Sequence, residues 1–158
     1  MKRDYLFCDE VYSYGLANSN EYTFLHPGEN DEPLDNWVSG SYFSDYMNYC
    51  DEAFNYKAAY VNQERDVHPP LYYMLLHTVC RFFKEAGYSA IPGIVLNLII
   101  LAFVDIVLMY VAANLLESRW RGLAATVLWG ISSVGFSNCM LIRMYLLLTF
   151  GVLLFGAG

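Results

Sequence analysis

Two groups of residues in the first half of the chain, an acidic pair and an aspartate near a histidine, are the types best suited to acid–base chemistry. Asp9 and Glu10 stand between aromatic and apolar neighbours, and Asp66 comes two residues before His68. If the first stretch is helical, Asp9 shares a face with Ser13, and its carboxylate could accept a proton from a hydroxyl or amine nucleophile. Acids are also common in the first turn of a helix for structural reasons alone. Both interpretations stay open at this point.

The segment around His68 combines a titratable pair with a rigid break. Asp66 and His68 flank Val67, so in extended backbone both face the same direction. That arrangement would suit a metal-binding pair or a base with its orienting carboxylate. On spacing alone, the plainer interpretation as a turn acid and a surface histidine is favoured. Pro69 and Pro70 follow, and a double proline is a stiff, non-helical break.

The apolar run after the prolines predicts a helix at a membrane surface. Residues 71–83 are too few to cross a bilayer, because apolar runs of roughly 10–14 residues are more often interfacial. Tyr73, His77 and Arg81 recur every four residues, opposite an apolar face. We therefore predict a juxtamembrane interfacial helix over residues 69–86 in which His77 and Arg81 reach lipid phosphate. Ordinary snorkelling of these side chains explains the pattern equally well.

Three apolar segments in the second half predict transmembrane helices. Residues 91–116 contain one formal charge, Asp105, and residues 122–142 contain none. At about 1.5 Å per residue, either segment can cross a hydrocarbon core of about 30 Å. A third segment, 144–158, is too short to cross and indicates a truncated span. The expected organisation is all-α, with an extracytoplasmic loop over 1–68, the interfacial helix, and transmembrane helices over 90–158.

Charge is placed very unevenly along the chain. Residues 1–68 hold 13 of the 16 acids and 4 of the 9 bases, whereas residues 69–158 hold 3 acids and 5 bases. The first half suits water and the second suits lipid, and the acidic balance argues against a nucleic-acid partner. Arg119 and Arg121, between the first two spans, favour the cytoplasmic side, which places residues 1–90 outside. A loop of that size requires a preceding span, so we expect a fragment of a larger polytopic protein.

Two ionisable residues accompany the apolar segments. Arg143, followed by Met144 and Tyr145, lies at the outer end of the second segment. Arginine is a natural bidentate phosphate ligand, although a helix-end anchor is the favoured interpretation without further context. Asp105 is costly in lipid and should face the bundle interior with a partner. A structural hydrogen bond to another span is the favoured explanation of Asp105.

The remaining features are weaker. The four cysteines show no Cys-x-x-Cys spacing; a Cys8–Cys50 disulfide is open, but free thiols are favoured. Residues 26–37 predict an exposed, turn-rich loop. Residues 41–61 predict an aromatic-rich helical lid or collar at headgroup level.

Three motifs together resemble one family. The stretches 9–19, 62–73 and 142–145 are similar to bacterial membrane glycosyltransferases of the GT-C fold. That group includes the protein O-mannosyltransferases and the aminoarabinose transferase of lipid A. The motifs follow the family's order and cover nearly the whole chain, and the middle one is quite specific.

The resemblance implies a polytopic helical bundle of the GT-C type in the bacterial cytoplasmic (inner) membrane, with juxtamembrane helices in a large extracytoplasmic first loop. It implies an inverting transfer of a sugar from a polyprenyl-phosphate donor to an acceptor in the cell envelope. The acceptor would be a glycan, a lipid or a protein, reached on the extracytoplasmic side. No cofactor is expected with certainty, and a divalent metal ion stays an open alternative.

The family's functional residues match positions in this sequence. The Asp-Glu pair near the acceptor matches Asp9 and Glu10, the catalytic residues, with Asp9 as the base. The arginine near the donor phosphate matches Arg143. The residues expected to bind donor phosphate or substrate are Arg143, Tyr145, His68, Asp66, His77 and Arg81, and the structural motif comprises Pro69, Pro70, Tyr72 and Tyr73.

One departure and two alternatives limit the resemblance. Many relatives carry an aspartate shortly after this arginine, but here Tyr145 precedes Leu146, Leu147, Leu148 and Thr149, so no metal ligand is assigned. The fragment alone is expected to be inactive because later spans would complete its cavity. A transporter or flippase would explain Asp105 but not the long acidic loop. A non-catalytic binding or assembly subunit would keep the His-Pro-Pro motif as architecture.

Overall fold

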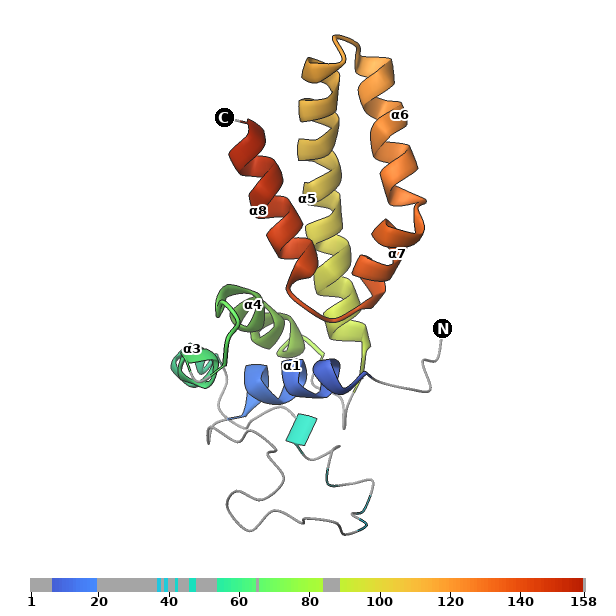
Figure 1. Ribbon diagram of the computed structural model, residues 1–158. Helices are drawn as coiled ribbons and strands as arrows, with labels where there is room; N and C mark the ends of the chain where they lie inside the picture. Colours follow the sequence, from blue (N-terminus) through green and yellow to red (C-terminus); the bar gives the residue numbers. More distant parts are fainter. Residues whose placement is uncertain are drawn as a thin grey trace. The chain divides into compact units, whose positions relative to one another are not determined.

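The computed structural model describes residues 7–19, 37, 39, 42, 46–47, 54–64, 66–83 and 89–157. Throughout these residues, the regular secondary structure is helical (Figure 1). This confirms the expected all-α class for the described part of the chain. The chain divides into two compact units, Met1–Pro92 and Gly93–Gly158. Each unit is described by itself.

Several expectations fall partly or wholly outside these residues. Of the predicted loop 26–37, the structure describes only Trp37, and it does not describe Cys50. Cys8 is a free thiol. Of the predicted collar over 41–61, Tyr42, Tyr46 and Met47 are helical, and a helix begins at Tyr56.

Among the described residues of the first unit, three short helices contact one another. They are α1 (Cys8–Asn18), α3 (Tyr56–Glu64) and α4 (Leu71–Cys80). Their shared core consists of fully or almost fully buried side chains, among them Tyr14, Leu16, Ala59, Tyr72, Tyr73 and Leu76. Burial of large aromatic side chains is a major favourable term in folding a unit of this size.

The double proline fixes where α4 begins. Pro70 is the N-cap residue, and its carbonyl accepts a hydrogen bond from Met74 N at 3.0 Å. Proline is tolerated here because the first-turn amides of a helix have no intrahelical partner. The helix ends after ten residues, and the amide of Arg81 bonds back to the carbonyls of His77 and Thr78.

The expected orientation of the α4 polar stripe needs a correction. Tyr73, His77 and Arg81 are buried, whereas Leu71 at the start of the helix is exposed. The stripe faces inward because α1 and α3 both pack against α4. Their position on one helix face was predicted, but the prediction that this face reaches the lipid headgroups differs from the structure.

The second unit contains one helix suited to crossing a membrane. It is α5 (Ile91–Leu115), with 25 residues and a mean hydropathy of 2.7 in its most apolar window. Its buried face includes Leu96, Asn97, Ile100 and Val104, which recur at helical spacing. The length and composition of α5 permit a span, and a larger bundle of spans is not part of what the structure shows.

The second apolar segment forms two helices in place of one. These are α6 (Arg119–Gly130) and α7 (Ser133–Met140), and their axes differ by 57°. The break occurs at Ser132, whose hydroxyl accepts a hydrogen bond from Gly135 N at 3.0 Å and so caps α7. Serine is a strong N-cap residue because its short side chain reaches the free amides of the first turn. The bent pair counts as a second span only if it is treated as one broken helix.

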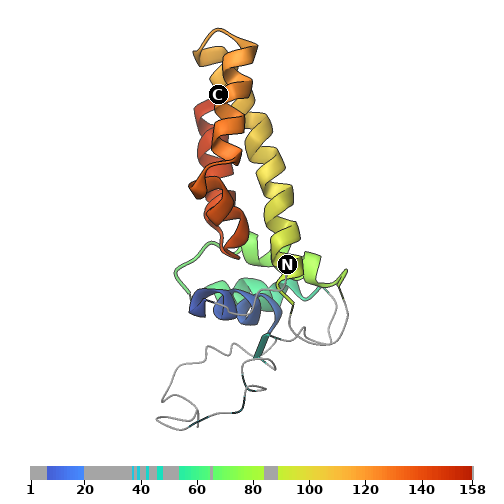
Figure 2. The same ribbon diagram turned by 90° about the vertical axis from the view of Figure 1, so that its right-hand side faces the viewer.

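α5 and α6 approach closely at Ala113 and Gly122, near the turn that joins them, and α8 (Tyr145–Ala157) follows along the chain. In both views α6 runs back alongside α5 (Figure 1, Figure 2). A Cβ atom added at Gly122 would lie 2.8 Å from the backbone nitrogen of Ala113 and 2.9 Å from its Cα. Phe103 of α5 and Phe150 of α8 have ring centroids 6.0 Å apart. Gly122 therefore lets the start of α6 approach the backbone of α5 at Ala113, as small residues do in membrane helices.

Replacing Gly122 by alanine is expected to destabilise the second unit by about 1–3 kcal/mol, the usual cost of overpacking a close contact. The backbone of Ala113 cannot rotate away as a side-chain tip would. Gly151→Ala is the matched control, since nothing lies within 4 Å of the added Cβ. That change should be neutral or stabilise by about 0.5–1 kcal/mol through helix propensity. Denaturant titration of both variants in detergent measures the difference, and equal stabilities would contradict the packing argument.

Candidate functional site

The predicted site residues are distributed over both units. The second unit contains Arg143 and Tyr145. The first unit contains all the others, which are Asp9, Glu10, Asp66, His68, His77 and Arg81, with the structural residues Pro69, Pro70, Tyr72 and Tyr73.

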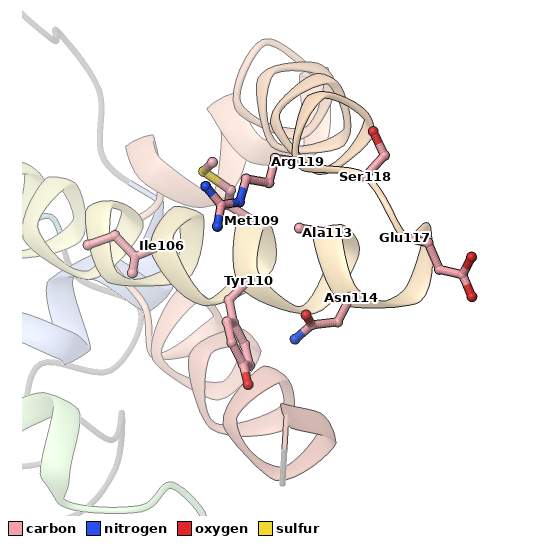
Figure 3. A pocket seen from close by; sticks show the side chains of 8 residues that line it. All are labelled: Ile106, Met109, Tyr110, Ala113, Asn114, Glu117, Ser118 and Arg119. Carbon is pink, nitrogen blue, oxygen red and sulfur yellow. The ribbon is translucent and has the colours of Figure 1, made fainter.

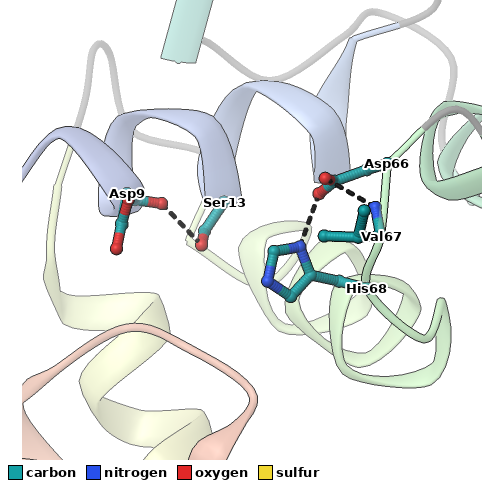
Figure 4. Close-up of polar contacts among 5 residues, drawn as sticks. All are labelled: Asp9, Ser13, Asp66, Val67 and His68. Atoms are coloured by element: carbon teal, nitrogen blue, oxygen red, sulfur yellow. Dashed lines mark hydrogen bonds and ion pairs between the residues drawn. The ribbon is translucent and has the colours of Figure 1, made fainter.

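Asp66 and His68 form a directly bonded acid–imidazole pair. The Nδ1 atom of His68 lies 2.8 Å from Oδ2 of Asp66, and Oδ1 of Asp66 accepts a hydrogen bond from the Val67 amide at 2.8 Å (Figure 4). A carboxylate can only accept, so the neutral imidazole carries its proton on Nδ1 and donates it to Asp66. This is the arrangement of a base held by its orienting carboxylate.

Aromatic side chains hold the ring of His68 from the α4 side. The ring centroid of Tyr73 lies 6.2 Å from that of His68, and Tyr73 makes an edge-on contact with Tyr72 at 5.6 Å. Both tyrosines are buried in the first unit. Tyr72 and Tyr73 therefore contribute to the packing of the first unit.

Asp9 and Glu10 have different surroundings although they are adjacent. Asp9 is exposed, and its backbone carbonyl accepts a hydrogen bond from Ser13 Oγ at 2.9 Å (Figure 4). Glu10 has an exposed fraction of 0%, and its Oε2 accepts a hydrogen bond from Phe7 N at 3.0 Å. This bond satisfies an amide that would otherwise be free at the start of α1. The geometry gives Glu10 a helix-capping role, whereas Asp9 lies at the surface of α1.

His77 is the centre of a buried polar network. Its Nδ1 lies 3.2 Å from Oδ1 of Asn18, whose Nδ2 donates to the carbonyl of Tyr14 at 3.0 Å. Because that amide is fixed with its oxygen toward the ring, Nδ1 of His77 must be the donor. Tyr56 completes the surroundings, with its ring 5.8 Å from the imidazole and its hydroxyl 3.0 Å from Thr78 Oγ1. The network joins α1, α3 and α4.

Burial lowers the pKa of His77 below its ordinary value of 6.5, and the nearby charge of Arg81 lowers it further. A hydrogen bond to the Ala17 backbone acts in the opposite direction. The folded protein therefore binds this proton less readily than the unfolded chain does.

Acidification is consequently expected to destabilise the first unit through His77. As pH falls below about 6.5, the unfolded chain takes up the proton first, so the free energy of unfolding decreases until the folded form is protonated too. Above that pH the group contributes no slope. His77→Gln should flatten this part of a melting-temperature profile between pH 7 and pH 5, whereas His68→Gln should retain the slope from His77. An unchanged profile in His77→Gln would contradict the assignment.

Arg143 lies at a break between α7 and α8. It is 8% exposed, and its Cζ atom is 6.0 Å from the ring centroid of Tyr145. Guanidinium groups at this distance from an aromatic face are attracted to it. The position after α7 agrees with the predicted helix-end location, and the role at a donor phosphate stays a prediction.

The sequence did not single out four buried amide side chains. They are Asn18, Asn62, Gln63 and Asn97. Asn62 Nδ2 bonds the carbonyls of Leu16 and Ser19 at 3.0 and 2.8 Å, which ties α3 to the end of α1. Asn97 could have been singled out from the sequence, because a lone amide side chain inside an apolar, lipid-exposed segment needs a hydrogen-bond partner within the protein.

A hollow of about 550 Å³ lies beside the turn between α5 and α6 (Figure 3). Its lining mixes apolar and polar side chains from the end of α5 and the start of α6, including Met109, Tyr110, Asn114 and Arg119. None of the predicted site residues lines this hollow. Asp105, one residue from its lining residue Ile106, has a buried Oδ1 with no hydrogen-bond partner within the described residues.

Across the described ranges, no three His, Cys, Asp or Glu side chains are grouped as metal ligands. No protein-family model matches the chain, and comparisons with curated proteins and with solved structures find no match. The first unit thus presents an oriented imidazole, an exposed carboxylate and a buried polar network, and the second presents a buried arginine beside a helix break.

Proposed function

We propose that the protein is an inverting membrane glycosyltransferase that moves a sugar from a polyprenyl-phosphate donor to an acceptor outside the cytoplasmic membrane. The observation that carries the proposal is the Asp66–His68 pair, bonded at 2.8 Å, immediately before Pro69, Pro70 and α4. The same residues carry the resemblance to the GT-C glycosyltransferases. The apolar helix α5 supports a membrane location because its length and composition permit a span.

The proposed reaction is a single displacement at the anomeric carbon. The acceptor oxygen forms a bond to that carbon while its proton passes to the Asp9 carboxylate. The bond from the anomeric carbon to the phosphate oxygen breaks, and its electron pair stays on the polyprenyl phosphate. Arg143 would stabilise that charge with its guanidinium group. Inversion follows because the acceptor attacks the face opposite the leaving group.

The Asp66–His68 pair has a separate role in this scheme. With Nδ1 bonded to Asp66, the imidazole can accept a hydrogen bond from a sugar or acceptor hydroxyl through Nε2. Held groups of this kind position reactants, and correct positioning is worth several kcal/mol of barrier, on the order of 7–11 in the best cases.

The test uses the full-length protein in nanodiscs with a radiolabelled polyprenyl-phosphate sugar and a membrane extract as the acceptor pool. We expect transfer of label that decreases in both Asp66→Asn and His68→Gln. Leu71→Gln, at an exposed position of the same helix, is the control and should transfer normally. Absence of transfer by the folded wild type with a panel of such donors would contradict the proposal. Equal transfer with the pair removed would contradict its role in positioning.

One observation favours a second candidate, a proton- or ion-coupled transporter or flippase. Asp105 lies within α5, and its buried Oδ1 has no partner in the described part of the chain. Ionisable groups inside membrane helices often mark transport pathways. Flux in proteoliposomes that disappears in Asp105→Asn, without label transfer in the wild type, would favour this candidate.

A further inference from the structure

The break between α7 and α8 is held by a side chain from α5. Asn97 has an exposed fraction of 0%, and its Nδ2 donates to the carbonyl of Cys139 at 3.0 Å and to that of Leu141 at 2.8 Å. These carbonyls lie 42 and 44 residues away in the sequence. One amide group therefore bonds both carbonyls at the end of α7.

These hydrogen bonds satisfy backbone carbonyls at the end of α7. The last carbonyls of a helix have no backbone amide within the helix to donate a hydrogen bond to them. In apolar surroundings they cannot accept one from water either. The chain leaves the helix at Leu141, whose amide still bonds Ser137 O, and the amide of Arg143 turns back to Leu141 O at 2.9 Å. The carbonyl of Leu141 thus accepts from both Asn97 and Arg143, as its two lone pairs allow.

Gly93, one helical turn before Asn97, makes room for the side chain of Ile142, the residue after Leu141. A Cβ atom at Gly93 would lie 2.6–2.9 Å from three side-chain carbons of Ile142, which is fully buried. Gly93 and Asn97 occupy the same face of α5. This face therefore determines the backbone on both sides of Ile142, directly before Arg143.

We propose that Asn97 is a positioning residue for the donor phosphate: it fixes the backbone from which Arg143 binds the polyprenyl phosphate, with Gly93 giving Ile142 its place. The inference rests on the proposed function, since it assigns Asn97 to the donor part of that reaction. Asn97 itself does not touch the phosphate. Its effect passes through the carbonyls of Cys139 and Leu141 to the residue that follows them.

The test compares Asn97→Leu, which keeps the size of the side chain but removes its donors, with Asn97→Gln, which keeps an amide. Asn114→Leu is the control because Asn114 is exposed on the same helix. Misplacement of a binding group by about 1 Å can cost on the order of 100-fold in rate. We expect Asn97→Leu to lower kcat/KM for the donor by about that factor. The KM for the acceptor should not change, and Asn97→Gln should restore part of the loss.

Two cysteines supply a structural readout that does not depend on turnover. Cys139 and Cys80 are both buried, in the second and first units respectively. Asn97→Leu should accelerate maleimide labelling of Cys139 through local opening, whereas labelling of Cys80 should keep its wild-type rate. Unchanged labelling of Cys139 would overturn the proposal. So would faster labelling of Cys139 with unchanged donor kinetics.

Binding of radiolabelled undecaprenyl phosphate separates this inference from the proposed function. If the wild type transfers no sugar but binds this lipid, the proposed function fails while the inference is supported by weaker binding in both Asn97→Leu and Arg143→Gln. If the wild type does not bind it, or if Asn97→Leu binds as the wild type does, the inference is overturned.

Discussion

Asp9→Asn is expected to reduce sugar transfer by about 10²–10⁴-fold, the usual contribution of a general base. Asp9 is exposed on α1, and asparagine cannot take the proton from the acceptor hydroxyl. The substitution keeps the size of the side chain and leaves the Asp9 backbone carbonyl free to accept from Ser13. Transfer of radiolabelled sugar by the variant in nanodiscs measures the loss, and its thermal melt shows whether folding is retained.

Variants of the neighbouring residue, Glu10, are the controls for Asp9→Asn. Glu10→Ala removes the acceptor of the Phe7 amide and should destabilise α1 by about 1 kcal/mol. Glu10→Gln keeps an acceptor at the same place and should retain both folding and transfer. Equal transfer by wild type and Asp9→Asn would remove Asp9 from the mechanism and favour a non-catalytic binding or assembly role. Loss of transfer in Glu10→Gln would show that the buried carboxylate has a chemical role as well.

Arg143→Gln is expected to reduce transfer by about 10²–10³-fold, as for removal of a group that stabilises developing charge. The departing polyprenyl phosphate gains negative charge as the anomeric bond breaks, and glutamine offers no positive charge to balance it. Arg143 is 8% exposed and faces the ring of Tyr145 at 6.0 Å, so its guanidinium group has few alternative positions. Initial rates at varied donor concentration measure the effect on kcat and KM.

Two further arginine variants serve as comparisons. Arg143→Lys retains the charge but not the bidentate geometry, so its rate should fall between those of wild type and Arg143→Gln. Arg121→Gln removes an exposed arginine on α6 and should leave donor kinetics unchanged. Similar losses in Arg121→Gln and Arg143→Gln would indicate a general effect of charge. Wild-type rates in Arg143→Gln would exclude a role at the donor phosphate.

Several local features of this protein could be predicted from the sequence because they depend on neighbouring residues. The prolines at 69 and 70 determine where α4 begins, and the apolar composition of α5 makes it suited to a membrane. The pairing of Asp66 with His68 was one of two interpretations of their spacing, and the sequence favoured the other, a turn acid and a surface histidine. The break at Ser132 could also have been predicted, because serine is a strong N-cap residue and here it lies inside an apolar run. The prediction nevertheless treated residues 122–142 as one helix.

The buried polar contacts could not be predicted in this way. The i, i+4 spacing placed Tyr73, His77 and Arg81 on one face of α4, but not toward the core of the first unit. The bond between His77 and Asn18 joins residues 59 positions apart. Periodicity describes the faces of a single helix, whereas the identity of the covering helix depends on packing between distant segments.

The sequence by itself determined the chemistry available to this protein: an acid–imidazole pair before a proline break, adjacent carboxylates and an arginine after apolar residues. Only the tertiary structure decided how those groups are used. It buries Glu10 as a cap and leaves Asp9 exposed, and it brings Asn97 to carbonyls 42 and 44 residues away. The physical reason is that a buried amide or carbonyl needs a hydrogen-bond partner, and helix packing determines which partner is within reach.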